Sequence, residues 1–418
     1  MDFRGRKVVL TGIGIVAPSG VGHRAFWEAL LEGRSLVGPI TRFDARDYPS
    51  RVAAEVRDRS YEELLDPRLL RTTTLATQFA LAAAELALRD ARLSRPLLPP
   101  ESTGVYLGTA LGGWLDAEKQ FALLQLRGAR RVNPFLANSA PHHGTAAQIA
   151  AQYGIEGPNL TLTTGCPSSL VATAEAAERI ASGELDVCLA GGTEAPVSPL
   201  VVGGMTRTNE LSVRNEDPEH ASCPFDRSHC GLVVAEGACI LVLETEERAR
   251  ARGISPYAAV LGGATSCDAQ GLWTLDPSGE TAARTIHRLF RKTAIQPADL
   301  DYVCSHANSS PAFDRKETVV LTKALGEFAA RIPVSSIKGV LGHPFGAAGA
   351  FQTAAAALAL RTGTIPHTHN LEEPDPECQL AHVREHPLRA SLGHVLVSSY
   401  GYGGLNAYLL LGRADEAG

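Results

Sequence analysis

TLTTGCPSSLVATAEAAERI, residues 161–180, decides the fold of this chain. Its polar and β-branched start predicts a strand, and the small apolar residues after Pro167 predict a helix. Proline suits the first turn of a helix, and Gly165 permits a tight turn before it. Cys166 therefore stands at a strand-to-helix junction, near the positive end of the helix dipole, which favours its thiolate. We expect Cys166 to be a nucleophile; the competing interpretation is a buried cysteine that acts as a small hydrophobe.

The same order of elements returns late in the chain. Residues 332–363, IPVSSIKGVLGHPFGAAGAFQTAAAALALRTG, predict a strand, a turn that carries His343, and a second helix of small residues. A helix that is apolar on all faces is a buried helix. We therefore predict two pseudo-symmetric halves, residues 1–255 and 256–418, with two central helices covered by sheets on both sides. In this arrangement the turns at Cys166 and His343 could face each other.

The remaining pattern alternates strands with helices, which predicts an α/β fold. Expected strands cover 8–17, the first part of 103–113, 159–164, 186–192, 237–244, 257–266, 301–306, 334–338, 393–399 and 406–411. Expected helices cover 25–33, 75–92, 142–154, 167–182, 246–252, 281–294, 314–326 and 346–362.

Composition excludes several classes of protein. The chain has 418 residues, 44% of them hydrophobic and 20% charged, as in ordinary globular proteins. Its net charge of −6 argues against a general nucleic-acid binder. No apolar run reaches the roughly 18 residues of a membrane span. The N-terminal residues run into a strand without a cleavage site, and the eight cysteines form no C-x-x-C pair. We therefore expect a cytoplasmic protein without a metal site, disulfides or a membrane anchor.

Two histidines at strand-to-helix junctions are candidate partners of the thiol. His306 lies in VCSHANSSPAFDRKE, and His343 lies in IKGVLGHPFGAAGA. Lys338 and Glu317 are close to them in the sequence, and such a pair would hold the orientation and protonation of the imidazoles. Each histidine could instead be a satisfied core residue, and the Lys–Glu pair could be a solvated surface pair.

A glycine-rich run, SSYGYGGLN at 398–406, separates the last two expected strands. Its simplest interpretation is a hairpin turn. The functional interpretation is a backbone N–H donor for an oxyanion that develops beside Cys166.

Taken together, these segments identify a family. The chain resembles the β-ketoacyl-[acyl carrier protein] synthases of the elongating type, including the ketosynthase subunits of type II polyketide systems. Besides the segments of Cys166 and His306, the resemblance rests on VVLTGIGIVAPSG, ITRFDARDYPSRVAAEV, RNEDPEHASCPFDRS, EGACILVLE, VSSIKGVLGHPFGAAGA, NLEEPDPECQL and SSYGYGG. It implies a thiolase-like, five-layer α-β-α-β-α fold and a decarboxylative Claisen condensation.

The resemblance also implies roles for single residues. Cys166 would be acylated by an acyl thioester carried on the phosphopantetheine of an acyl carrier protein. His306 and His343 would bind the malonyl thioester, promote loss of CO2 and stabilise the enolate. Lys338 and Glu317 would support the histidines. The reaction implies no metal or redox cofactor.

The glycine-rich run takes part in the same site by resemblance. The backbone N–H groups of Cys166 and Tyr400 would form an oxyanion hole, with Tyr400 and Gly401 also forming the gate.

Several segments depart from the family pattern and point to a specialised branch, in polyketide or specialised fatty-acid synthesis. The usual H-G-T-x-T is HANSS, so that Asn308 and Ser310 replace the threonines that contact pantetheine. The gating phenylalanine becomes Tyr400, which adds a hydroxyl near the thiol. R-D-G-F-V-x-G-E-G-A becomes HCGLVVAEGA, with Cys230 in place of the acid.

Surface and channel residues follow from the resemblance alone. Leu111 and Trp273 are candidates for the acyl channel or its gate. Basic side chains are candidates for docking the acidic carrier protein, although solvated surface arginines are an equal alternative: Arg68, Arg71 and Arg207. The family predicts a homodimer or a heterodimer with a related subunit. HANSS leaves open a non-elongating acyltransferase, whereas Cys166 argues against a non-catalytic chain-length subunit.

Overall fold

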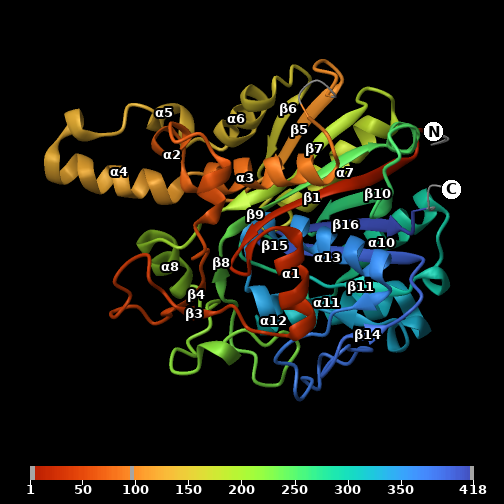
Figure 1. Ribbon diagram of the computed structural model, residues 1–418. Coiled ribbons are helices and arrows are strands. Elements are labelled where there is room, and N and C mark those ends of the chain that lie inside the picture. Colours follow the sequence, from red (N-terminus) through yellow and green to blue (C-terminus); the bar gives the residue numbers. More distant parts are fainter. Residues whose placement is uncertain (1–4, 95–97, 415–418) are drawn as a thin grey trace.

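The computed structural model describes residues 5–94 and 98–414 (Figure 1). Two groups of five strands form one continuous sheet ladder. The first group, in spatial order, is β1 (Val8–Ala17), β9 (Gly237–Thr245), β7 (Val187–Glu194), β5 (Thr103–Gly108) and β6 (Asn159–Leu162). The second is β10 (Ala258–Cys267), β16 (Leu405–Gly412), β15 (His394–Gly401), β11 (Tyr302–Cys304) and β12 (Val334–Ser335). The antiparallel pairing of β1 with β10 joins the two groups. Beyond this pairing, the register shifts between β1 and β9 and between β10 and β16.

Two buried helices lie between these groups of strands, as predicted. Helix α7 (Ser168–Ala181) contacts β5 and β7 of the first group and β10 and β16 of the second. Helix α13 (Ala348–Thr362) contacts β7, β9, β15 and β16, and it packs directly against α7. A side chain at Gly349 would place its Cβ 2.5 Å from the Cβ of Leu170, so the absence of a side chain there permits the close approach of the helices.

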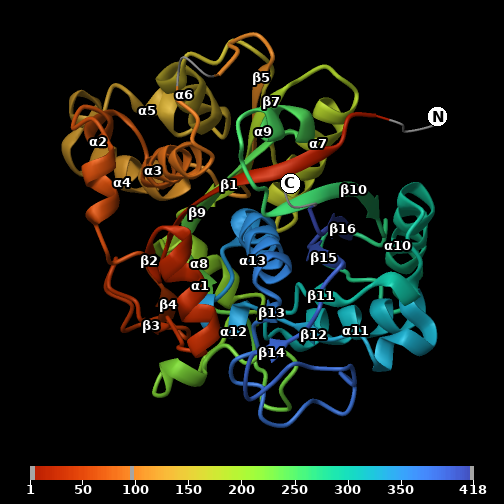
Figure 2. The same cartoon turned by 45° about the vertical axis from the view of Figure 1, so that its right-hand side comes forward.

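Outer helices cover the far faces and complete the five-layer α-β-α-β-α arrangement (Figure 2). Helices α3 (Leu75–Asp90) and α6 (His143–Tyr153) pack on the first group of strands. Helix α10 (Glu280–Thr293) packs on β10 and β16 and also contacts α11 (Pro311–Leu325). The predicted fold class is therefore confirmed. That residues 1–255 and 256–418 form separate domains stays a prediction.

The smaller elements surround the two ends of the central helices. The helices are α1 (His23–Glu32), α2 (Leu69–Thr72), α5 (Leu136–Ser139), α9 (Glu246–Ala251) and α12 (Lys338–Leu341). The strands are β2 (Gly20–Val21), β3 (Gly38–Pro39), β4 (Val52–Ala54), β8 (Val234–Ala235), β13 (Thr364–Ile365) and β14 (Leu388–Arg389). No helix in the described ranges is long and apolar enough to cross a membrane.

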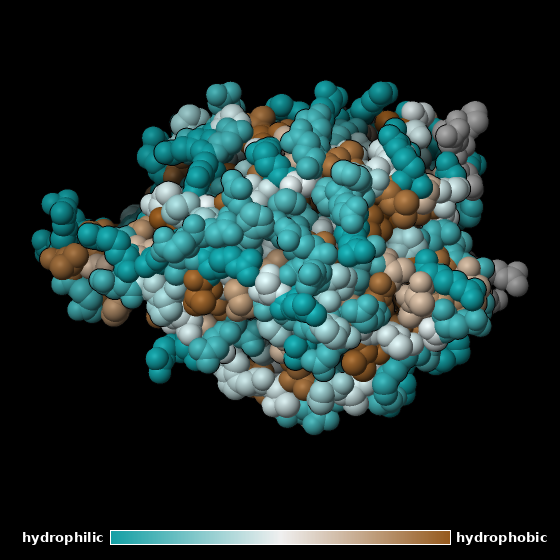
Figure 3. Space-filling model, turned by 90° about the horizontal axis from the view of Figure 1, so that it is seen from below, coloured by the Kyte–Doolittle hydropathy of each residue, from teal (hydrophilic) through white to brown (hydrophobic). Residues whose placement is uncertain are grey.

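Among the described residues, five α-helices had no counterpart in the sequence prediction: the four-residue helices α2, α5 and α12, and the longer helices α4 (Trp114–Arg127) and α8 (Pro199–Thr206). Helix α4 projects from the body as an arm (left in Figures 1 and 3), and apolar side chains gather at its tip. Phe121 and Leu126 are 62% and 82% exposed. A helix with apolar residues facing outward has no buried stripe, so its sequence does not produce the usual amphipathic signal.

Candidate active site

The predicted junction forms as a tight elbow between β6 and α7. Gly165 takes the left-handed backbone conformation, with φ at 64°, and the helix begins at Ser168. The Ser168 hydroxyl closes the turn, because it donates to the Gly165 carbonyl at 2.5 Å and accepts from the Thr164 amide at 2.9 Å. Cys166 is half-buried at the tip of this elbow.

His343 lies directly opposite the thiol. Its Nε2 is 3.1 Å from the Cys166 Sγ, although the two residues are 177 positions apart. A second elbow holds the ring: Gly342 has φ 72°, and the His343 backbone pairs with β8 through Val233 O at 2.8 Å and Ala235 N at 3.1 Å. The structure thus brings together the two turns that the internal repeat placed in corresponding positions.

His306 completes the group of catalytic candidates at the end of β11. Its ring lies 5.3 Å from the ring of His343, edge to face. Both rings are fully buried, and burial, reinforced by the charge of Lys338, holds the pKa of each well below the usual range. Both imidazoles are therefore neutral near pH 7, and each has one N–H donor and one acceptor.

Lys338 and Glu317 act on the backbone beside His306 rather than on either ring. The Lys338 Nζ donates to the His306 carbonyl and, at 3.4 Å, to Gln352 Oε1. Glu317 accepts from the amides of His306 at 2.9 Å and Ala307 at 2.6 Å. Burial raises the pKa of Glu317 and lowers that of Lys338. Both side chains are buried, so the alternative of a solvated surface pair is wrong, whereas their predicted support of the histidines stays a prediction.

The protonation of Cys166 differs from the sequence expectation. Burial raises the pKa of this thiol to about 12, while the charge of Lys338 lowers it and that of Glu194 raises it. This direction is opposite to the expectation that the helix N-terminus would favour the thiolate, and loss of solvation is its largest cause. The resting side chain is a thiol, and its deprotonation needs a base. His343 is in contact with the thiol and can serve as that base.

The glycine-rich run is a hairpin and also lies against the elbow. A Cβ on Gly401 would fall 2.8 Å from Pro167 Cδ and 3.4 Å from the Cys166 amide nitrogen. The buried Tyr400 ring lies 5.6 Å from the His306 ring, edge to face. Its hydroxyl accepts from the Tyr408 hydroxyl at 3.3 Å. The added hydroxyl is therefore held by a second tyrosine, and the oxyanion and gate roles of Tyr400 and Gly401 stay predictions.

The two polar residues of HANSS make internal contacts. The Asn308 side chain accepts from the Ser310 amide at 3.0 Å through Oδ1, which turns its Nδ2 toward His306 Nε2 at 3.4 Å. Ser310 donates from its hydroxyl to Glu210 Oε2 at 2.7 Å. Their predicted contacts with pantetheine stay predictions and would have to replace these bonds.

The channel and docking candidates lie at the periphery. Leu111 is half-buried in the loop after β5, and its amide is 3.3 Å from Glu194 Oε1. Trp273 is 66% exposed, with its ring 5.7 Å from that of Tyr402. The three arginines are exposed, at the start of α2, within α2 and after α8 respectively: Arg68, Arg71 and Arg207. The predicted roles of these five residues stay predictions.

One buried carboxylate beside the site had no counterpart in the sequence prediction. Glu194, at the end of β7, is fully buried and accepts from the Thr109 hydroxyl at 3.1 Å and from the Ala110 amide. Burial raises its pKa to about 7. An acid that directly ends an apolar strand, LAGGTE, was the available signal, since such a residue faces the carboxyl edge of a sheet.

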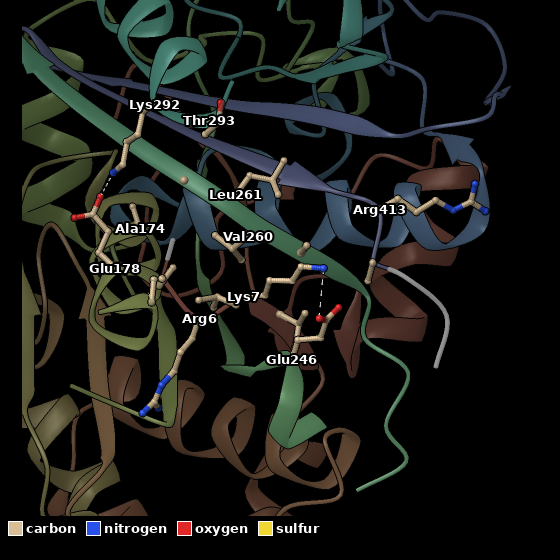
Figure 4. Close-up of a pocket in the computed structure, with 18 residues that line it drawn as sticks. Arg6, Lys7, Ala174, Glu178, Glu246, Val260, Leu261, Lys292, Thr293 and Arg413 are labelled. Carbon is tan, nitrogen blue, oxygen red and sulfur yellow. Dashed lines mark hydrogen bonds and ion pairs between the residues drawn. The ribbon is translucent and has the colours of Figure 1, made fainter. Parts of the chain in front are cut away.

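A cavity of about 360 Å³ lies at the opposite end of α7 (Figure 4). The Lys7–Glu246 ion pair, 3.6 Å long, and the Lys292–Glu178 ion pair border it. None of the predicted site residues lines this cavity. It is therefore separate from the chemistry around Cys166.

Comparison with known sequences finds similar proteins over nearly the whole chain. The N-terminal domain model of the β-ketoacyl synthases matches residues 5–249, and the C-terminal domain model matches residues 257–372. The chain is 38% identical over 411 residues to 3-oxoacyl-[acyl-carrier-protein] synthase 2 of Coxiella burnetii, covering 98% of this chain and 99% of that protein. It is 38% identical to the tetracenomycin polyketide synthase ketoacyl synthase alpha subunit of Streptomyces glaucescens, covering 98% of each.

Solved structures show the same fold. The ishigamide ketosynthase/chain length factor matches with a TM-score of 0.92 and 31% identity, over 98% of this chain and 100% of that one. A type II polyketide synthase ketosynthase, in complex with its acyl carrier protein, matches with a TM-score of 0.91 and 30% identity, over 98% and 100%. With two family models across most of its length and relatives above one-third identity, the chain belongs to the β-ketoacyl synthase family.

Proposed function

We propose that this protein is an elongating condensing enzyme, which joins an acyl group held on Cys166 to a malonyl unit held on an acyl carrier protein. The observation that carries the proposal is the 3.1 Å contact between Cys166 Sγ and His343 Nε2, with the His306 ring 5.3 Å from that of His343. One nucleophile, one base in contact and a second neutral imidazole are the groups that this chemistry needs.

In the first step the thiol attacks the carbonyl of an acyl thioester. The Cys166 proton passes to His343 Nε2 as the S–C bond forms, which overcomes the raised pKa of the buried thiol. The phosphopantetheine sulfur leaves and takes the proton from His343. The net result is transfer of the acyl group from one sulfur to another, with no change of oxidation state.

In the second step the malonyl thioester loses CO2 to form an enolate. The neutral, fully buried rings of His306 and His343 supply N–H donors for the enolate oxygen. The acylated sulfur has no proton to donate to His343 Nε2, so this nitrogen is available to donate to the enolate once the ring carries its proton there instead of on Nδ1. The enolate carbon then attacks the acyl carbonyl, the bond to Cys166 breaks, and a 3-oxoacyl thioester two carbons longer leaves.

The substrates imply the partners. An acyl carrier protein delivers both thioesters on phosphopantetheine, as the similar ketosynthase complex with an acyl carrier protein supports. The exposed apolar arm and the exposed edge strand β6, with Leu160 45% accessible, support pairing with a second copy or a related subunit. A similar structure that consists of a ketosynthase and a chain length factor supports the heterodimer.

One observation favours a second candidate, acyl transfer without elongation. Because Asn308 Oδ1 is taken by the Ser310 amide, the Asn308 amide N–H faces His306 Nε2, which makes that nitrogen an acceptor in the resting site. An Nε2 that accepts cannot donate to an enolate. Elongation therefore requires the malonyl thioester to displace Asn308, whereas acyl transfer through Cys166 does not.

Intact-mass spectrometry separates these functions. Wild-type protein and Cys166→Ala would be incubated with acyl-carrier protein and then with malonyl-carrier protein. An adduct on wild type alone, discharged to a 3-oxo product two carbons longer, establishes the condensing enzyme. An adduct that is transferred but never elongated, also after the arm's partner subunit is added, establishes the acyltransferase. No adduct with any carrier protein would refute both functions.

A further inference from the structure

A buried histidine outside the reaction centre lies between two carboxylates. His229 Nδ1 is 3.0 Å from Asp314 Oδ2, and its Nε2 is 3.0 Å from Asp375 Oδ2. All three side chains are almost inaccessible to solvent. None of them takes part in the steps described above.

Hydrogen bonding determines the charge of this ring. Asp314 also accepts from the backbone amides of Phe225 and Asn308, each at 2.8 Å. Asp375 also accepts from the Arg315 guanidinium at 2.9 Å and the Glu377 amide at 2.8 Å. Every other partner of the two carboxylates is a donor, which matches acceptor-only carboxylates, and beside two such acceptors both ring nitrogens of His229 act as donors. The ring is therefore an imidazolium, and with Arg315 it balances the two buried negative charges.

This cluster leads directly to the reaction centre. Asp314 lies in the first turn of α11, and its Oδ1 holds the amide of Asn308, two residues after His306. The segment that carries His229 holds the same loop a second time, because the Gly231 amide donates to the Ser309 carbonyl at 2.8 Å. Ser309 has φ 74°, a conformation that requires support from its surroundings.

We propose that His229 is a positioning residue for the second half-reaction: as an imidazolium it fixes Asp314 and, through it, the loop that places His306. This inference rests on the proposed condensing function and deepens it. Loss of the charge leaves Asp314 and Asp375 to repel each other at the base of the loop. The elbow of Cys166 has no contact with this cluster among the described hydrogen bonds, so acylation does not depend on it.

The direction of the pH effect follows from the contacts. Burial lowers the pKa of His229, but the hydrogen bonds and charges of Asp314 and Asp375 outweigh burial and raise it above its ordinary value. A raised pKa means that the charge is complete below pH 6.5 and is lost as the pH rises through the higher folded value. The neighbouring titratable and charged groups are Arg315, Glu377, Cys378, His382, Asp226 and, through Asp314, Lys338.

The decisive comparison is between His229 and an arginine, whose charge does not titrate in this range. CO2 release from malonyl-carrier protein would be measured against pH for wild type and His229→Arg. We expect wild type to lose activity by about tenfold per pH unit above the pKa of His229, and His229→Arg to lack this decline. Lys338 is present in both proteins, so any decline that it causes cancels in the comparison.

His229→Gln tests the charge itself. We expect it to lower the rate of CO2 release about 10-fold to 100-fold, the usual cost of misplacing a reacting group, while acylation of Cys166 changes less than about threefold. The matched control is His382→Gln: the His382 ring packs on Phe225 in the same cluster, and within the described part of the chain its one hydrogen bond is to the Cys378 carbonyl. This control should retain CO2 release.

Three outcomes contradict the inference. Identical alkaline declines in wild type and His229→Arg would overturn it while leaving the proposed function intact. Equal losses of acylation and CO2 release in a folded His229→Gln would show a general structural role. If wild type acylates Cys166 but releases no CO2 at any pH, the condensing function fails and the inference fails with it. The first comparison does not depend on whether His229→Gln folds.

Discussion

Cys166 and His343 stand in matching tripeptides, Gly-Cys-Pro and Gly-His-Pro, one in each half of the molecule. In both, a glycine with positive φ turns the chain before the functional residue. The first tripeptide leads directly into α7, whereas α12 lies between β12 and the second, and a 3₁₀ turn follows it before α13. Cys166 is half-buried and open to a substrate, but His343 is fully buried. The same backbone turn thus presents the proposed nucleophile in one half and holds its proposed base in a buried position in the other.

The most direct test of this comparison removes one imidazole ring at a time. His343→Ala should slow acylation of Cys166 by about 100-fold to 10,000-fold, the usual contribution of a general base. His306→Ala should leave acylation within about threefold and abolish CO2 release, because only the second step needs its donor. Quenched-flow mass spectrometry and CO2 release measure the two steps. Equal effects of both variants on acylation would show that the two rings do not act in different steps.

The thiol itself provides the next test, since its raised pKa separates it from the expected thiolate. Only the thiolate reacts with iodoacetamide, and below a pKa of about 12 the thiolate fraction rises about tenfold per pH unit. Alkylation of Cys166 should therefore accelerate about 100-fold between pH 7 and pH 9. Mass spectrometry of the Cys166 peptide measures the rate. A plateau below pH 9 would show that the helix dipole outweighs burial after all.

Gly342 and Gly165 should differ in how strongly an alanine substitution destabilises the protein. Gly342, with φ 72° and ψ −166°, lies in a region that only glycine occupies, and an added Cβ would lie 3.1 Å from the Val233 carbonyl. Gly165→Ala meets nothing closer than 3.8 Å and strains only the backbone. We expect losses in the free energy of unfolding of about 2–3 kcal/mol for Gly342→Ala and about 1 kcal/mol for Gly165→Ala. Urea titrations followed by fluorescence measure both, and the reverse order would contradict the comparison.

The smallest expected change in rate concerns Asn308, whose side-chain amide faces Nε2 of the His306 ring. Asn308→Thr removes the N–H that faces Nε2 and should raise CO2 release about 2-fold to 5-fold, about the value of one weak hydrogen bond. Acylation should not change. Asn308→Asp is the matched control, because it keeps the shape but adds a charge, and it should lower CO2 release. An unchanged rate in Asn308→Thr would show that this contact does not restrain the ring.

Much of this fold could be predicted because its decisive elements are locally encoded. The central helices are rich in small residues on all faces, and only burial between sheets explains such a composition. Gly165 and Pro167 mark the Cys166 elbow by their backbone preferences alone. The pairing of Cys166 with His343 followed from the internal repeat, since equivalent turns of two stacked halves face each other.

Other properties depend on contacts that no local pattern reveals. Burial raises the pKa of Cys166, and residues distant in the sequence provide that burial, which the dipole argument could not include. Lys338 and Glu317 lie beside His306, but their hydrogen bonds to its backbone depend on tertiary geometry that the sequence does not show. The role of His229 depends on Asp314 and Asp375, which are 85 and 146 positions away. The outward-facing residues of α4 indicate a surface that this chain alone does not cover.

The pairing of His343 with β8 has a consequence for the order in which the protein becomes active. Val233 and Ala235, which hold the His343 backbone, leave the ribosome before His343 does, and so does Cys166. Synthesis adds about 5–20 residues per second, so the nascent thiol waits roughly ten to thirty seconds for its base. During that interval Cys166 has no His343 to accept its proton. Acylation that uses this base therefore cannot begin until the second half docks.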